Sequence, residues 1–262
     1  MYNVLLTIFG FALIFAATTL GAALVFFFKK EISNKTNVLF LGFASGIMIA
    51  ASIWSLIIPS IEGAGDYGSW NFVPAVVGFL LGGLFFVFLD KVAPQLYAGG
   101  NNQEDFKSDI KKPVKMFIAM TIHNIPEGLA VGFAFGAAAA YGTQSATLSA
   151  LGLAVGIAIQ NFPEGAAVSL PLQRATGSKS KSFLFGMASG AVEPVAAVIG
   201  YFLASSLIKA QPWLLSFAAG AMIFVVAEDL IPEAKTDNNS HLGTWGVMFG
   251  FAIMMALDVA LG

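Results

Sequence analysis

Two short segments of this sequence place polar residues at matching positions inside apolar runs. Residues 123–128 read His-Asn-Ile-Pro-Glu-Gly and residues 160–165 read Gln-Asn-Phe-Pro-Glu-Gly, so His123 and Glu127 share a four-residue spacing with Gln160 and Glu164. On a helix, residues four apart lie on one face, one turn along the axis. Two such helices facing each other could offer a nitrogen and several oxygens to one ion, and imidazole with carboxylate suits Zn²⁺, Fe²⁺, Mn²⁺ or Co²⁺.

Three further polar residues belong to the same candidate site. Asn124 and Asn161 lie next to the histidine and the glutamine, where each could be a metal ligand or an interhelical hydrogen-bonding group. Glu193 adds a carboxylate, as a ligand or as a proton relay, and a relay is also open for Glu127 and Glu164. Each glutamate has a neighbouring proline, whose missing N–H frees a carbonyl in the preceding turn.

The composition indicates that these residues lie inside a membrane. The sequence is 57% hydrophobic and 11% charged, against about 45–50% and about 25% in an ordinary soluble domain. An ionised group at the centre of a membrane helix costs about 2.5–3.5 kcal/mol. With no Lys or Arg at that depth, the three glutamates must be protonated or bound to a cation. The absence of cysteine excludes disulfides and thiolate sites, and nothing suggests nucleic-acid binding.

Hydropathy and polar breaks predict an all-α membrane protein with eight transmembrane helices. The first apolar run is too long for a signal-peptide core and is kept as a span. All but one of the 13 Lys and Arg residues fall in alternate loops, the exception being Lys209. The positive-inside rule therefore predicts that both termini are extracytoplasmic. The predicted spans are residues 4–28, 37–60, 72–90, 114–139, 146–172, 182–208, 213–234 and 243–261.

We expect residues 1–262 to form a single transmembrane domain of a multi-pass protein in the cell (inner) membrane, with a lipid bilayer as its surroundings. The longest polar break, at about residues 92–113, mixes Lys, Glu, Asp, Gly and Asn. Such a composition indicates a mobile cytoplasmic loop.

Internal repeats predict how the spans are related. Leu-Gly-Phe-Ala-Ser-Gly-Ile-Met-Ile at residues 41–49 matches Leu-Ser-Phe-Ala-Ala-Gly-Ala-Met-Ile at 215–223, and Gly78 and Gly82 recur at the same spacing as Gly246 and Gly250. The Asn-x-Pro-Glu-Gly segments relate span 4 to span 5. The members of each pair cross in opposite directions, which predicts an inverted repeat relating helices 1–3 to 6–8. Such proteins hold their substrate near the midplane.

These motifs closely resemble those of the ZIP (Zrt-, Irt-like) metal transporters, in a compact bacterial-type form. The resemblance runs from residues 41–46 through both Pro-Glu-Gly segments and Glu193-Pro to Ala-Glu-Asp-Leu-Ile-Pro-Glu at 227–233. It implies an eight-helix bundle that moves Zn²⁺ or related ions toward the cytoplasm, with the residues above lining the central site. It also implies that Met48 is a ligand, although a methionine in an apolar helix is by itself more often a packing residue.

The resemblance further implies a route through the protein. Glu62 and Asp258 would lie near the outer entrance, and Glu228, Asp229 and Glu233 would lie toward the cytoplasmic exit. Two features depart from the family pattern. Asn161 stands where some members carry an aspartate, which removes a bridging carboxylate that a two-metal site would use. The loop at 92–113 lacks the histidines that many members have there, and His241 is the only histidine besides His123.

The leading hypothesis is transport of divalent transition-metal ions into the cytoplasm by alternating access, with Zn²⁺ the first choice and Fe²⁺, Mn²⁺, Co²⁺ and Cd²⁺ as further cargo. The carboxylates would exchange metal for protons during the cycle. The hypothesis includes no organic cofactor and no catalysis, and allows a homodimer. One alternative is an intramembrane metalloprotease, which needs a His-pair zinc motif that the sequence lacks. A second is a proton-coupled carrier of an organic solute.

Overall fold

The structure is a computed structural model that describes residues 2–27, 33–97, 111–235 and 241–261, and the regular structure in these ranges is helical. The 3₁₀ helices are η1 (Leu24–Phe26), η3 (Gly65–Trp70) and η4 (Ile208–Ala210), and the π-helices are η2 (Ser52–Ile57) and η5 (Val226–Leu230). The α-helices are α1 (Tyr2–Ala23), α2 (Asn34–Ala51), α3 (Ile58–Glu62), α4 (Phe72–Tyr97), α5 (Lys111–Tyr141), α6 (Gln144–Thr176), α7 (Lys179–Gly190), α8 (Val192–Ser206), α9 (Gln211–Val225), α10 (Ile231–Ala234) and α11 (Leu242–Leu261).

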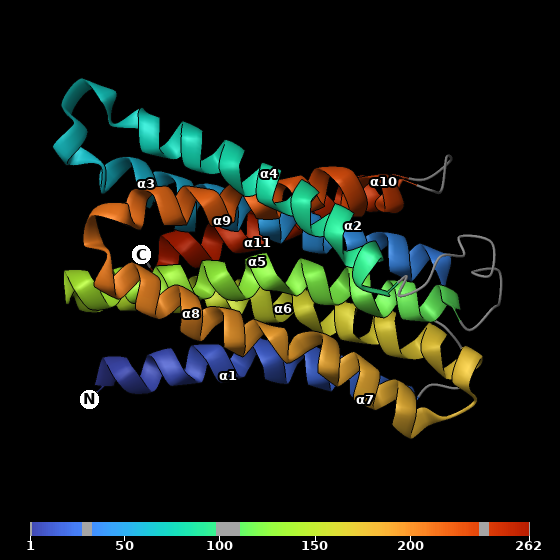
Figure 1. Ribbon diagram of the computed structural model, residues 1–262. Helices are drawn as coiled ribbons and strands as arrows, with labels where there is room; N and C mark the ends of the chain where they lie inside the picture. Colours follow the sequence, from blue (N-terminus) through green and yellow to red (C-terminus); the bar gives the residue numbers. More distant parts are fainter. Residues whose placement is uncertain (1, 28–32, 98–110, 236–240, 262) are drawn as a thin grey trace.

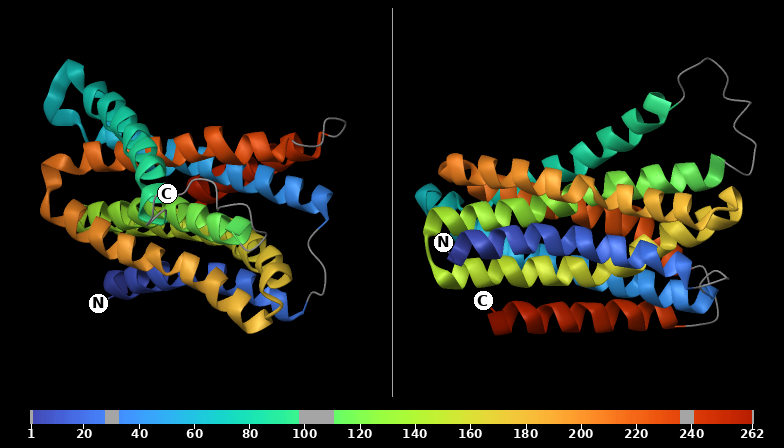
Figure 2. Two further views of the ribbon diagram at one scale, coloured as in Figure 1. Left: turned by 45° about the vertical axis from the view of Figure 1, so that its right-hand side comes forward. Right: turned by 90° about the horizontal axis from the view of Figure 1, so that it is seen from below.

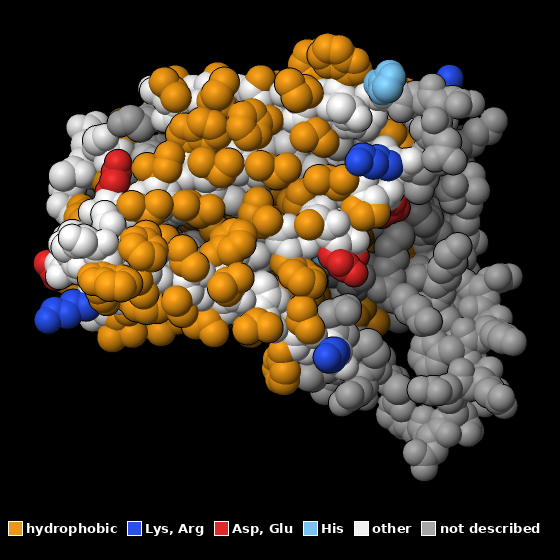
Figure 3. Space-filling view, turned by 90° about the horizontal axis from the view of Figure 1, so that it is seen from above, with side chains coloured by type: hydrophobic (Ala, Val, Ile, Leu, Met, Phe, Trp, Pro, Cys, Tyr) orange, Lys and Arg blue, Asp and Glu red, His pale blue; other side chains and the backbone are white. Residues whose placement is uncertain are grey.

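The long helices lie side by side as a bundle, and both chain termini lie at the same end of it (Figure 1). Helix α4 leans away from the rest at one end, as the second view of Figure 2 shows. Large apolar side chains on its outer face are exposed, among them Leu80 (60%) and Leu84 (63%). In Figure 3 hydrophobic side chains cover the middle of the face shown, whereas most of the charged ones lie toward the ends. This distribution fits a protein surrounded by lipid.

Local sequence signals explain where several helices begin and end. The side-chain oxygens of Ser33, Thr143 and Ser178 accept hydrogen bonds from backbone N–H groups in the first turns of α2, α6 and α7. These caps satisfy donors that would otherwise be unpaired at a helix start. Gly177 ends α6 with φ at 66°, a left-handed conformation that glycine adopts without a steric penalty.

Helices in the described ranges agree with most of the predicted spans. Six are long and apolar enough to cross a membrane, namely Asn3–Phe26, Asn34–Glu62, Gln144–Leu170, Lys179–Ser206, Ile208–Ala234 and Leu242–Ala260. The predicted third span corresponds to the shorter apolar helix Phe72–Phe88. The predicted fourth span lies within α5. This helix is continuous, but its sequence contains the polar residues of the candidate site, and it is not among the six. The structure thus supports a multi-pass membrane protein, and the number of eight crossings stays a prediction.

The predicted loop at about residues 92–113 is too long at both ends. Helix α4 continues through Tyr97 and α5 begins at Lys111. Residues 92–97 read Val-Ala-Pro-Gln-Leu-Tyr. Proline disfavours the interior of a helix, so Pro94 together with the polar residues that follow leads the sequence to predict too early an end for this helix. Residues 98–110, the centre of the predicted loop, lie outside the described residues.

The helices pair in a pattern that matches the predicted repeat. The most extensive contacts join α2 to α11, α4 to α9, α5 to α8 and α1 to α6. A Cβ atom added at Gly82 would lie 1.9 Å from the carbonyl oxygen of Phe217, and one at Gly250 would lie 2.0 Å from that of Phe43. In the repeat, Gly82 corresponds to Gly250 and Phe43 to Phe217. Both helix pairs therefore use an equivalent glycine for the same close approach.

The two π-helices also occupy equivalent positions. Helix η2 follows α2 and η5 follows α9, and each is followed by an Ile-Pro dipeptide that opens α3 or α10. The N–H of Ile58 donates to the carbonyl of Ile53, and that of Ile231 donates to Val226, a spacing of five residues in both cases. Because π-helical segments widen a helix and frequently occur at functional sites, they direct attention to the residues around them.

Candidate metal centre

The predicted central residues converge in the interior of the bundle. Helices α5 and α6 are in contact with each other, and α5 also packs along α8. Every polar side chain of the cluster except His123 is buried, with exposed fractions of 0% for Asn124, Gln160, Asn161 and Glu193, 1% for Glu127 and 5% for Glu164. The structure therefore brings together residues that are up to 69 positions apart along the chain, between Asn124 and Glu193.

Four oxygens in this cluster have no hydrogen-bond partner among the described residues. They are Asn124 Oδ1, Glu127 Oε2, Gln160 Oε1 and Glu164 Oε2. Buried polar atoms are nearly always paired, and a buried acceptor without a donor costs free energy. Within the same ranges, Glu127 and Glu164 form no ion pair with a Lys or Arg. The chemistry that these oxygens share is the ability to bind a cation.

The remaining atoms of the cluster form a hydrogen-bond network. Gln160 Nε2 donates to Glu127 Oε1 at 2.5 Å and lies 3.4 Å from Asn161 Oδ1. Asn161 Nδ2 donates to Glu193 Oε2 at 2.8 Å. On the α5 side, Asn124 Nδ2 donates to the backbone carbonyl of Ser189 in α7 at 2.9 Å. Each amide thus uses its nitrogen within the protein, and the Asn124 and Gln160 oxygens remain free.

His123 points to a different partner from the one the spacing suggested. Its Nε2 lies 3.0 Å from Asp229 Oδ2 in η5, and its ring packs on Phe86 with the ring centres 5.5 Å apart. The His123 and Asp229 side chains are 14% and 42% exposed. Within the described ranges, no three His, Asp or Glu side chains gather closely enough to hold one metal ion by themselves. The cation-binding character of the cluster therefore depends on its amide oxygens as well.

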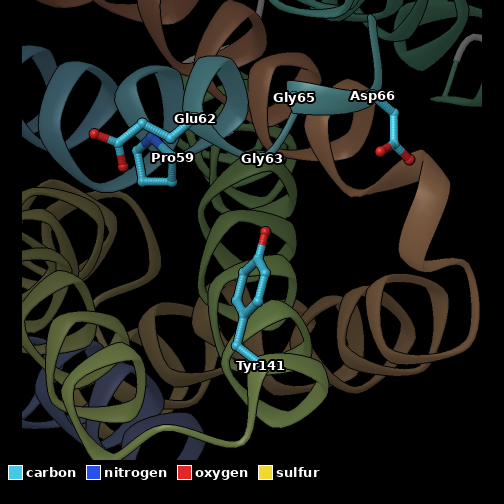
Figure 4. Close-up of a pocket in the computed structure, with 6 residues that line it drawn as sticks. All are labelled: Pro59, Glu62, Gly63, Gly65, Asp66 and Tyr141. Carbon is cyan, nitrogen blue, oxygen red and sulfur yellow. The ribbon is translucent and has the colours of Figure 1, made fainter.

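The resemblance also implied roles for Met48 and for two residues at the outer end. Met48 is 1% exposed and lies in the apolar core, and its role as a ligand stays a prediction. Glu62 lines a pocket of about 490 Å³ together with Asp66 and Tyr141 (Figure 4). A second cavity of about 110 Å³ shares Tyr141 with this pocket and includes Ser55.

Asp258 connects α11 to the π-helix η2. Its Oδ1 accepts a hydrogen bond from Ser55 Oγ, and its Oδ2 has no partner among the described residues. Asp258 therefore lies beside the second, smaller cavity, which Ser55 lines, rather than in the larger pocket that contains Glu62. Both positions are compatible with the implied entrance.

The three residues predicted for the exit lie close together along the chain in η5 and α10. Glu228 and Glu233 are exposed, and Asp229 is partly exposed. Asp229 contacts a residue of the central cluster, His123.

Sequence reasoning missed two residues that hydrogen-bond to the site. Thr18 Oγ1 donates to Glu193 Oε1 at 2.8 Å, and neither Thr18 nor Ser189 was a candidate residue. The repeat did not single out Thr18, because the register that relates Leu41 to Leu215 carries Glu193 to Thr19, whose Oγ1 has no partner among the described residues. For Ser189 no signal existed, because its backbone carbonyl is the group that binds.

The fold and the interior of the bundle define the class of this protein as a multi-pass integral membrane protein with a polar, cation-compatible centre. Comparison with known proteins identifies it further. A family model described as "ZIP Zinc transporter" matches residues 4–116 and 114–258. The chain is 40% identical to "Zinc transporter ZIP11" of Xenopus tropicalis, across 99% of this chain and 98% of that protein. It is 37% identical to "Zinc transporter ZIPB" of Bordetella bronchiseptica, across 97% and 81% of the two chains.

A third relative, "Zinc transporter ZupT" of Clostridium perfringens, is 32% identical across 97% of this chain and 95% of its own length. The chain therefore belongs to the ZIP family of zinc transporters. It is a metal-ion transporter and not an enzyme, which confirms the family assignment made from its motifs.

Proposed function

We propose that this protein carries Zn²⁺ and related divalent ions into the cytoplasm through the cluster between α5 and α6. The observation that supports this most directly is the set of four buried oxygens without hydrogen-bond partners, two from glutamates and two from amides. Carboxylate and amide oxygens are groups that divalent cations bind, so we expect a bound ion to supply partners to oxygens of this set. Such groups have no role in a solid apolar core, where each would cost about 1–3 kcal/mol.

The proposed ligands are Glu127 and Glu164 through their free oxygens, with Gln160 and Asn124 contributing amide oxygens. His123 would add a nitrogen after leaving Asp229. Imidazole and carboxylate ligands accept Zn²⁺, Fe²⁺, Mn²⁺, Co²⁺ and Cd²⁺, and geometry decides among them. All three relatives are named zinc transporters and match 97–99% of this chain, which favours Zn²⁺ as cargo.

The route follows the two cavities and the exit carboxylates. In the proposed topology, an ion enters the pocket beside Glu62 and passes the cavity beside Ser55. Between this cavity and the cluster, α5 and α6 present buried apolar side chains, including Val131, Leu153 and Ile157, each 0% exposed. On the other side, the partly exposed His123 and Asp229 connect the cluster to the exit. A site that is sealed on one side and accessible on the other is what alternating access requires.

The helix pairs suggest how the seal opens. Close glycine contacts join α2 to α11 and α4 to α9, and they also join α1 to α6 and α5 to α8, the helices that carry the cluster. Relative movement of these two groups, as in other inverted-repeat transporters, would expose the site to each side in turn. Both termini would face the outside of the cell (inner) membrane, and a homodimer stays a prediction of the sequence.

Uptake into liposomes tests the proposal. Purified protein reconstituted with a zinc-sensitive dye inside the vesicles should show saturable Zn²⁺ entry, and Glu127→Gln and Glu164→Gln should abolish it. Ser169→Ala is a matched control, because Ser169 is a buried polar residue of α6 whose described hydrogen bond goes to Ala166 in its own helix. The proposal fails if the unchanged protein moves no Zn²⁺, Cd²⁺, Fe²⁺ or Mn²⁺, or if both glutamine variants transport normally.

A further inference from the structure

The Glu193 carboxylate is fully occupied by neighbouring donors. Its side chain is 0% exposed, Oε1 accepts from Thr18 Oγ1, and Oε2 accepts from Asn161 Nδ2, each at 2.8 Å. Glu127 and Glu164 differ, because each keeps one oxygen without a partner. We propose that Glu193 is a positioning residue that holds the amides of a one-ion site and does not itself bind the ion. This rests on the proposed function.

The hydrogen bonds of Glu193 reach the proposed ligands through two amides. A carboxylate only accepts hydrogen bonds, so Asn161 must turn its Nδ2 toward Glu193 and its Oδ1 toward Gln160. The Oδ1 atom then faces Gln160 Nε2, which also donates to Glu127 Oε1. Gln160 can therefore present only its oxygen to an ion. In this way Glu193 determines which atoms of Gln160 and Glu127 remain free.

The packing around Glu193 leaves it little room to leave this position. A Cβ atom at Gly128 would lie 2.4 Å from the Glu193 backbone carbonyl oxygen, and one at Gly190 would lie 3.1 Å from Glu193 Oε1 and 2.8 Å from Thr18 Cβ. These glycines let α5, α7 and α1 close around the glutamate. Thr18 Oγ1 also lies 3.3 Å from the Ile14 carbonyl, but the shorter bond to a carboxylate is the stronger one.

The amide of Asn161 bears on how many ions the site can hold. An amide at this position supplies a donor to Glu193, whereas an aspartate would supply a negative charge beside it. With Glu193 and Asn161 paired to each other, two carboxylates that have an unpartnered oxygen remain, Glu127 and Glu164. Two carboxylates balance the charge of one divalent ion. We therefore expect one ion per chain.

Glutamine at position 193 separates a positioning role from a ligand role. Its Oε1 can accept from Asn161 Nδ2, and its Nε2 can donate to Thr18 Oγ1, whose own proton then goes to Ile14 O. The network survives although the charge is lost. Alanine at the same position removes the network. A carboxylate that binds the ion directly loses most of its attraction for the ion with its charge, whereas a positioning residue keeps its role as long as its hydrogen bonds remain.

The test measures Cd²⁺ binding to the purified full chain in lipid nanodiscs by equilibrium dialysis with elemental analysis. We expect one ion per unchanged chain. Glu193→Gln should raise Kd by less than about tenfold and Glu193→Ala by about 10–100-fold, the range for residues that support metal ligands. Glu127→Gln should remove detectable binding. Two bound ions per unchanged chain, or a Glu193→Gln variant as defective as Glu127→Gln, would overturn the proposal.

Substitutions at Thr18 give an independent readout if Glu193→Ala does not fold. Thr18→Val keeps the shape but removes the donor, and should raise Kd by about tenfold, whereas Thr18→Ser should restore binding. Thr19→Val is the matched control, because Thr19 Oγ1 lies in the same turn and has no described hydrogen-bond partner. Equal Kd values for Thr18→Val and Thr19→Val would refute the positioning role. If the unchanged protein binds no Cd²⁺ or Zn²⁺, the proposed function itself fails.

Discussion

Replacing Glu164 by methionine should stabilise the empty protein while removing its cargo. Glu164 is 5% exposed, and its Oε2 has no hydrogen-bond partner among the described residues. Methionine has a similar length and flexibility and carries no group that needs a hydrogen bond. The substitution therefore removes an unpaired buried oxygen without leaving a cavity.

The size of the effect follows from the cost of that oxygen. An unsatisfied buried polar atom costs about 1–3 kcal/mol, so the metal-free Glu164→Met variant should gain stability of that order. Such a gain raises Tm by roughly 2–4 °C for each kcal/mol in a chain of about this size. Zn²⁺ at 100 times its Kd should stabilise the unchanged protein by about 2.7 kcal/mol. It should leave the variant unaffected.

The assay is thermal unfolding of both proteins in the same detergent, once with a chelator and once with Zn²⁺, followed by uptake in liposomes. We expect Glu164→Met to melt above the unchanged protein in chelator, to show no shift with Zn²⁺, and to transport nothing. Glu164→Gln, which keeps a polar group, should gain no stability in chelator. A metal-free Glu164→Met protein that melts lower than the unchanged protein would refute the reasoning about the unpaired oxygen.

Three further outcomes are expected. Gly82→Ala should destabilise the protein by about 1–3 kcal/mol, because the added Cβ meets the Phe217 carbonyl. Gly83→Ala should not, because its Cβ would lie 3.6 Å from its nearest neighbour. Equal melting temperatures of the two variants would contradict the close packing of α4 and α9. Asp229→Asn should lower both KM and the maximal uptake rate, since His123 would then be free to hold the ion; a raised KM would count against this. Uptake should rise with increasing pH, because imidazole and carboxylates bind metal only when deprotonated, and initial rates at fixed internal pH check the sign.

The sequence predicts a central cluster because membrane burial limits what its polar residues can do. In an apolar helix, a histidine or glutamate must find a partner, and repeated spacing in α5 and α6 indicates a shared one. The same reasoning finds the equivalent glycines of the helix pairs, since close approach in lipid requires small residues at regular intervals. Burial of Asn124, Gln160 and Glu164 in one place agrees with this reasoning.

The pairing of individual atoms could not be predicted from the sequence. The spacing places His123 on the same face as Glu127. The direction of a side chain also depends on its rotamer and on the neighbouring helices, and His123 meets Asp229 of η5. Likewise, Glu193 differs from Glu127 only through the donors of Thr18 and Asn161. The π-helices were also missed, because they arise from backbone hydrogen bonds that no residue type specifies.

The repeat explains why the site has a direction. Equivalent helices supply equivalent residues to the cluster, so a fully symmetric site would communicate equally with both sides. The symmetry is broken in two places. His123 corresponds to Gln160 in the Pro-Glu-Gly repeat, and Asp229 corresponds to Ser55 in the register that relates Leu41 to Leu215. The described hydrogen bond of Ser55 goes to Asp258, outside the cluster, whereas Asp229 contacts His123 directly. One end of the route therefore competes for a proposed ligand while the other does not, and we infer that this difference favours release toward the Asp229 side.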